Sequence, residues 1–148
     1  MKHLKTILIS VAILVITLTS VLIGIDCYKV SQPVKRTLTV PNTGVEIIVK
    51  GKYIENNIST TVSVENGWFK PYIQNIIAAY GLKEFMVIKF IDADEDELAE
   101  VRFDFADFAR LDGAMVAKRK TKISRNLYKK IDNVLVTYRG LDVKEFVR

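Results

Sequence analysis

The densest group of chemically capable side chains is acidic, with five carboxylates among the six residues 92–97. Alternating oxygen ligands at the start of a loop are typical of an EF-hand calcium site, which also needs a glycine at its sharp turn and a glutamate at its end. Glu97 and Phe103 occupy those two positions here. The spacing therefore excludes an EF-hand and favours a solvated hairpin tip, with a looser calcium site in a β-loop as the alternative.

Three further aspartates, Asp104, Asp107 and Asp112, could do general acid–base work if a cleft brought them together. The spacing gives no sign of a cleft and favours surface positions. One histidine and one cysteine in the whole sequence exclude histidine-based triads and zinc sites built from several thiolates. Phosphate-binding loops, dinucleotide fingerprints, nucleophile elbows and zinc-protease motifs are also missing from the sequence. We therefore predict no catalytic residue, no cofactor and no metal.

Basic side chains concentrate after the acidic stretch. Residues 92–112 carry nine carboxylates and two arginines, whereas residues 113–148 carry ten basic and three acidic side chains. The basic patch is defined here as Lys118, Arg119, Lys120, Lys122 and Arg125. In a strand its three lysines share one face, where they could contact anionic lipid or another polyanion, or guard an edge strand against aggregation.

A structural interpretation of the same charges is open as well. If strands at 98–105 and 114–123 pair, their opposite charges meet across the sheet. The formal net charge is +5, but neither an aromatic-interleaved motif nor a helix-turn-helix pattern accompanies the basic residues in the sequence. That combination argues against a nucleic-acid partner.

The elements that must position these side chains begin with an apolar segment. Residues 6–25 are uncharged and lie between Lys5 and Asp26, and as a helix they would be about 30 Å long, close to the hydrocarbon thickness of a bilayer. The sequence therefore predicts an N-terminal transmembrane anchor over residues 1–26. A cleaved signal peptide is the alternative, although the apolar run is longer than the usual core of a signal and a small-residue cleavage site does not follow it.

One side of this expected helix carries small residues, which define the helix-packing face: Ser10, Thr17, Ser20 and Gly24. Small residues four apart, such as Ser20 and Gly24, let membrane helices approach closely. Basic residues flank both sides of the apolar segment, so they do not decide its orientation. The short N-terminal tail favours a soluble part outside the cytoplasm.

The rest of the sequence predicts a polar linker over residues 27–36 and one β-rich domain over residues 37–148. Apolar alternation and β-branched residues predict strands at 45–53, 58–64, 85–91, 98–105, 114–123 and 134–138. Helical spacing predicts short helices at 71–80 and after Ser124. The expected fold class is mainly β, an antiparallel β-sandwich-like domain with one or two short helices behind one transmembrane helix; a sheet packed by one helix is the other variant.

Residues 84–140 resemble small bacterial immunoglobulin-like domains of the FxLYD type, which follow single membrane helices. The resemblance rests on residues 90–94, residues 101–105, Gly113, the basic strand after it, and Tyr128 with residues 134–138. It implies an extracytoplasmic β-sandwich with a non-catalytic role, and it assigns no functional residue.

Together these features predict a single-pass, membrane-anchored protein of the cell envelope whose exported domain binds or assembles with another envelope protein. Its expected partners are the membrane and that protein, with anionic lipid as a further contact and no nucleic acid. Two alternatives stay open: a carboxylate- or metal-dependent envelope enzyme, and a soluble domain secreted after signal cleavage.

Overall fold

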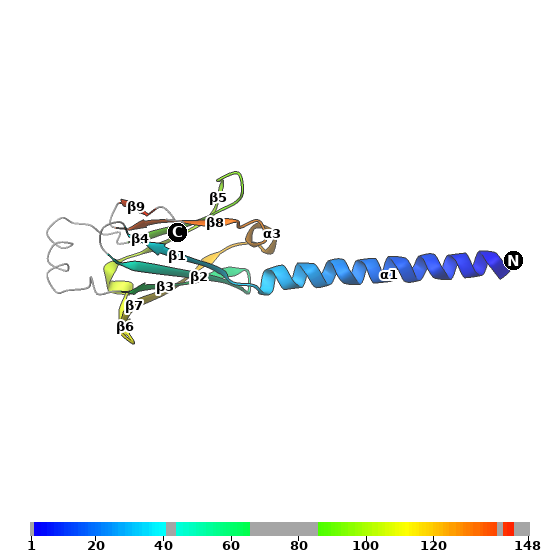
Figure 1. The fold of residues 1–148 in the computed structure, drawn as a ribbon, viewed down its shortest axis with the longest axis horizontal. Helices are drawn as coiled ribbons and strands as arrows, with labels where there is room; N and C mark the ends of the chain where they lie inside the picture. Colours follow the sequence, from blue (N-terminus) through cyan, green and yellow to red (C-terminus); the bar gives the residue numbers. More distant parts are fainter. Residues whose placement is uncertain (1, 41–43, 66–85, 139–140, 144–148) are drawn as a thin grey trace. The chain divides into compact units, whose positions relative to one another are not determined.

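A computed structural model describes residues 2–40, 44–65, 86–138 and 141–143. The chain divides into two compact units, Met1–Gln32 and Pro33–Arg148. The first unit contains one long helix, α1, and the second contains the β-strands (Figure 1). The predicted helix at residues 71–80 lies outside the described residues.

Helix α1 spans Lys2–Ser31. It runs through residues 27–31, which we expected in the linker, because the first residue that opposes helix continuation is Pro33. Within it, Ile7–Ser31 is long and apolar enough to cross a membrane, and its most apolar stretch is not buried within the structure. The linker is correspondingly short, since β1 begins at Val34.

The second unit is mainly β and has two antiparallel sheets. One sheet has the strand order β1-β2-β3-β7-β6 and the other has the order β5-β4-β8-β9. The five strands of the first sheet are β1 (Val34–Thr39), β2 (Glu46–Ile54), β3 (Asn57–Glu65), β6 (Ala109–Leu111) and β7 (Ala114–Lys122). The four strands of the second sheet are β4 (Met86–Ile91), β5 (Glu97–Phe103), β8 (Asn133–Tyr138) and β9 (Leu141–Val143).

All six predicted strands are present, with ends that shift by one or two residues. Two of the hairpins turn at residues whose types favour turns. Glu55 and Asn56 between β2 and β3 have φ of 50° and 60°, and Asp112 and Gly113 between β6 and β7 have φ of 47° and 86°. Two successive residues with positive φ suit the twist of a tight hairpin. Strands β1, β6 and β9 were not expected from the sequence.

The core lies between the two sheets and is built from alternate residues of each strand. Its largest fully buried side chains include Phe90 and Phe103 from the second sheet and Ile47 and Ile58 from the first. Gly51 on β2 faces this core, because a Cβ atom there would lie 2.8 Å from Ile58 Cδ1 and 3.0 Å from Phe90 Cε1. Glycine at this point leaves room for Ile58 of the neighbouring strand and Phe90 of the opposite sheet.

A short helix, α3 (Arg125–Tyr128), begins after Ser124 as the sequence predicts. The Ser124 hydroxyl accepts a hydrogen bond from the backbone N–H of Leu127 at 3.3 Å, which caps the helix. Tyr128 at its end is buried, and its hydroxyl donates to the carbonyl oxygen of Gly51 at 3.1 Å. The Tyr128 ring also packs against Tyr53, with ring centroids 5.3 Å apart. Helix α3 is therefore fixed to the inner side of β2.

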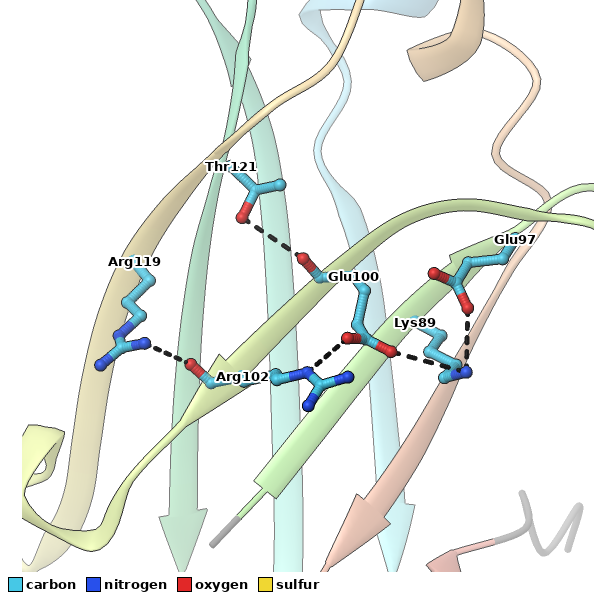
Figure 2. Close-up of polar contacts among 6 residues, drawn as sticks. All are labelled: Lys89, Glu97, Glu100, Arg102, Arg119 and Thr121. Atoms are coloured by element: carbon cyan, nitrogen blue, oxygen red, sulfur yellow. Dashed lines mark hydrogen bonds and ion pairs between the residues drawn. The ribbon is translucent and has the colours of Figure 1, made fainter. Parts of the chain in front are cut away.

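Strands β5 and β7 do not pair, because they belong to different sheets. The expectation that acidic and basic strands meet as ladder neighbours is therefore wrong. Side chains of β7 reach β5 instead (Figure 2). Arg119 Nη1 donates to the carbonyl oxygen of Arg102 at 2.8 Å, and the Thr121 hydroxyl donates to the backbone carbonyl oxygen of Glu100 at 3.5 Å. These contacts link the two sheets along one side.

Candidate functional site

The outer face of the five-stranded sheet carries a concentration of lysines drawn from three strands. Successive residues of a strand point to opposite faces, and the buried residues identify the inner face as the one holding Leu38, Val49 and Ala117. Along each strand, the residues that alternate with these inward-facing ones therefore face outward. We name the exposed outward lysines the lysine face: Lys35, Lys50, Lys52, Lys118, Lys120 and Lys122.

The strand register brings these lysines together. One outward row crosses four strands. It consists of Lys35 on β1, Lys50 on β2, Thr61 on β3 and Lys118 on β7, each paired with the next. In the next outward row, Ser59 lies between Lys52 and Lys120. Neighbouring strands are about 4.8 Å apart, so the lysines of β2 and β7 lie about 10 Å apart across β3. Two lines of ammonium groups thus border a line of short polar side chains.

Ser59 is the most enclosed member of that central line. It is only 4% exposed although it faces outward, and its hydroxyl has no hydrogen-bond partner among the residues that the structure describes. Its register neighbours on both sides are lysines. A buried hydroxyl without a partner costs free energy. Ser59 is therefore a buried hydroxyl without a partner among the described residues, in register with a lysine on either side.

Acidic side chains do not neutralise the lysine face. Across the described residues, none of its six lysines lies within ion-pair distance of a carboxylate. The outward carboxylates of this sheet, Glu46 and Glu65, lie together at the opposite end of β2 and β3. Glu55 lies in the turn between those strands, at the lysine end, and it is the one carboxylate of the β2–β3 hairpin there. The half of the sheet where the chain enters the domain is therefore strongly positive.

The outer face of the second sheet is organised differently, because the charged side chains that the structure describes on β4 and β5 are paired. Lys89 on β4 lies 2.9 Å from a Glu97 carboxylate oxygen and 3.5 Å from one of Glu100, and Glu100 also pairs with Arg102 (Figure 2). The Glu97 carboxylate raises the pKa of Lys89, and the Arg102 guanidinium holds the pKa of Glu100 below its usual value. This face neutralises its own charges, whereas the lysine face does not.

The structure divides the predicted basic patch. Lys118, Lys120 and Lys122 share one face of β7 as predicted, and all three are exposed. Arg119 points to the other face of β7, where its Nη2 lies 2.8 Å from Asp107 Oδ2 and its guanidinium lies 6.0 Å from the Phe103 ring centre. Arg125 is the first residue of α3 and not part of the strand. Arg119 therefore links the two sheets, and it does not lie on the same face of β7 as the three lysines of the basic patch.

Three members of the lysine face, Lys35, Lys50 and Lys52, were missed from the sequence. Lys35 lies in the expected linker, and the other two lie in a strand about 70 residues before the basic patch. The alternation at residues 49–53 marks Lys50 and Lys52 as outward residues, but it does not show which strand lies beside them. Arg36 shows the same inward pattern as Arg119, since its Nε donates to Asn133 Oδ1 at 3.0 Å.

The acidic run behaves as a hairpin tip between β4 and β5. Asp92 Oδ1 accepts hydrogen bonds from the backbone N–H groups of Asp94 at 3.1 Å and Asp96 at 2.9 Å, which organises the turn. In the described parts of the chain, His, Cys, Asp and Glu side chains form no group of three that could hold a metal ion. One of the two Asp92 carboxylate oxygens is thus engaged by the turn itself.

The aspartates considered for acid–base chemistry lie around the crossing from β5 to β7. Asp107 ends the short 3-10 helix η1 (Phe105–Asp107), binds Arg119, and accepts the backbone N–H of Asp104 at 2.7 Å. Asp104 lies 3.9 Å from the same guanidinium, and Asp112 lies in the tight turn before β7. The first two aspartates are used to hold Arg119 in place.

The residues of the helix-packing face all lie on α1. At 100° per residue they fall within one side of the helix. The hydroxyls of Thr17 and Ser20 donate to backbone carbonyls of the same helix, at 2.9 Å to Ile13 and 2.8 Å to Ile16. A Cβ atom at Gly24 would have open space around it. This face can therefore offer close approach to another helix, while these two hydroxyls already have partners within α1.

Comparison of the chain with protein-family models, with curated proteins and with solved structures finds no match. The resemblance to FxLYD domains therefore stays a prediction.

Proposed function

We propose that the protein is a single-pass membrane protein whose β domain, displayed outside the cytoplasm, binds another component of the cell envelope without catalysing a reaction. One observation carries the proposal: an exposed apolar helix precedes a separate, well-packed β unit. The large apolar side chains from Ile7 to Ile25 are each more than half exposed. In water that surface would be unfavourable, whereas lipid would cover it.

The β domain supports a binding role through the difference between its two outer faces. The second sheet neutralises its charges internally, while the lysine face holds six positive charges without carboxylate partners among the described residues. A surface with one sign of charge attracts oppositely charged partners. The acidic residues first considered for catalysis are used in a turn or in holding Arg119. The resemblance to FxLYD domains points the same way.

Protease treatment of intact cells tests the proposal. A C-terminally tagged full-length protein should fractionate with membranes at full size, and external protease should remove the tag. A tag that survives in intact cells and is degraded after lysis would place the β domain in the cytoplasm and overturn the proposed side. A shortened protein found in the soluble fraction would overturn the anchor and favour a secreted domain.

The helix-packing face offers a second test, directed at assembly. Leucines at Ser20 and Gly24 would fill the space that another helix needs for close approach. We expect Ser20→Leu with Gly24→Leu to reduce cross-linking of the full-length protein to a membrane partner. Thr19→Leu is the matched control, because Thr19 lies about 100° around the helix from Ser20. Unchanged cross-linking in the double variant would remove this face as an assembly surface.

A further inference from the structure

We propose that the lysine face binds the phosphate-bearing headgroups of anionic lipids, in the same membrane that α1 crosses. This inference rests on the proposed function, since it requires α1 to be a membrane anchor. It extends the anionic-lipid contact expected for the basic patch to a surface built from β1, β2 and β7, and it names the membrane that this surface contacts.

Connectivity keeps the lysine face close to the membrane. Lys35 follows the last residue of α1, Ser31, by four positions, so at most about 14 Å of extended chain separates them. Lys50 lies directly opposite Lys35, and a paired residue on the next strand is about 5 Å away. These limits hold for any orientation of the β domain. Helix α1 continues for about 9 Å from Ile25 to Ser31, so Lys35 lies at most about 23 Å of chain beyond the apolar segment. That length lets the β domain turn this pair of ammonium groups toward the headgroups.

Edge protection does not account for the whole surface. Lysines on an exposed edge strand prevent aggregation, and β1 is an edge strand of its sheet. Strand β2, however, lies between β1 and β3. Its outward lysines, Lys50 and Lys52, therefore have no edge to protect. Their positions extend the positive charge across the sheet from β1 to β7.

The donor chemistry fits phosphate. An ammonium group offers three donors and no acceptor, and the partly exposed Thr61 lies in register between Lys50 and Lys118. Headgroup phosphates offer acceptors and negative charge. The ammonium group of a lysine is a compact charge that can contact mobile phosphates without a fixed geometry. Arg36 and Arg119, which suit fixed two-point contacts, instead bind groups of the protein itself.

An anionic membrane is favoured over a soluble acidic partner because the anchor has already brought it near. A tethered surface binds at high effective concentration and does not lose translational freedom at the moment of contact. Each lysine close to an anionic surface favours the docked state by about fivefold. Three such lysines are then enough to shift the ratio of docked to undocked domain by about a hundredfold.

The test uses the full-length protein in lipid nanodiscs with a fluorescent probe. Cys27 is changed to serine, Thr61→Cys places the probe between the lysine rows, and a quencher is attached to the lipid headgroup. We expect strong quenching in an equal mixture of phosphatidylcholine and phosphatidylglycerol, and little in phosphatidylcholine alone. Quenching should be lost in about 1 M NaCl, where the Debye length is about 3 Å.

Charge variants identify the surface. Replacing Lys50, Lys118 and Lys120 together by glutamine should lower the docked-to-undocked ratio by about a hundredfold. Lys89→Gln is the control, because Lys89 is a lysine of the opposite outer face that is already paired with carboxylates. A probe at Leu135, which lies beside Lys89 on that face, should show no dependence on lipid charge.

Two outcomes would overturn the inference. Equal quenching of the Thr61→Cys probe in neutral and anionic nanodiscs would show that lipid charge does not hold the face. Weak quenching together with lysine-dependent capture of an acidic envelope protein would assign the face to that protein instead. In either case, protease sensitivity of the tag in intact cells would leave the proposed anchored, exported domain standing, so the two proposals fail separately.

Discussion

Lys35 and Lys50 lie directly opposite one another on the neighbouring strands β1 and β2, and both side chains are exposed. Like charges in this position repel, and cross-strand charge pairs change stability by about 0.2–1 kcal/mol. The β domain therefore gives up some stability to keep two positive charges side by side.

This relationship predicts that charge reversal stabilises the domain. Lys50→Glu should raise the free energy of unfolding of the β domain by up to about 1 kcal/mol, because it converts a repulsive pair into an attractive one. Lys35→Glu should do the same. The double variant restores like charges and should lose most of the gain. Denaturation of the three variants in detergent at low salt gives the coupling energy, and simple additivity would contradict the interpretation.

The hydrogen bond from Tyr128 to Gly51 predicts a larger effect in the core. Tyr128→Phe removes the hydroxyl that donates to the Gly51 carbonyl oxygen at 3.1 Å, within a buried site. The expected loss is about 1–2 kcal/mol of unfolding free energy. Tyr53→Phe is the control, since its hydroxyl bonds to Asn56 at an exposed position and should contribute less. Equal losses of unfolding free energy in the two variants would show that the buried hydrogen bond stabilises the domain no more than the exposed one.

Tyr128 also predicts a pH dependence at alkaline pH. Burial raises the pKa of its hydroxyl above 10.0. The unfolded chain therefore loses this proton at lower pH than the folded chain does. The stabilisation is fully present below about pH 10 and decreases as the pH rises from there through the folded-state value. The stability difference between the native protein and Tyr128→Phe should shrink over that range, and a constant difference would contradict this assignment.

Local structure in this protein is readable from the sequence because its signals are local. Alternation marks the six main strands, and two residues with turn preference mark each of the hairpins at Glu55-Asn56 and Asp112-Gly113. Ser124 likewise marks the start of α3. Each signal depends on residues that are close in the chain.

The lysine face could not be read in the same way, because it depends on which strands are neighbours. Lys52 and Lys120 are 68 positions apart in the sequence, and only the order β2-β3-β7 brings them to either side of Ser59. The same limit affected Arg119. Alternation places it opposite to its neighbouring lysines, but the sequence does not show that β5 and Asp107 lie on that side.

Gly51 leads to a prediction about the distance between the sheets. In Gly51→Ala the new Cβ atom would lie 2.8 Å from Ile58 Cδ1, and both Ile58 and Phe90 are fully buried. Overpacking of this kind costs about 1–3 kcal/mol. Ile58→Val removes the atom that would clash, at its own cost of about 0.5–1.5 kcal/mol. The double variant should therefore be more stable than the sum of the single effects predicts.

Thermal or denaturant unfolding of the two single variants and the double variant measures this coupling. Val62→Ala is a suitable comparison for the second change, because Val62 is also a fully buried residue of β3 but is not among the atoms nearest to Gly51. Gly51→Ala combined with Val62→Ala should be additive or nearly so. If Ile58→Val fails to offset Gly51→Ala, the limiting contact is instead with Phe90, whose Cε1 and Cζ atoms would lie 3.0 Å and 3.1 Å from the new methyl group. The requirement for glycine would then be set by the opposite sheet and not by the neighbouring strand.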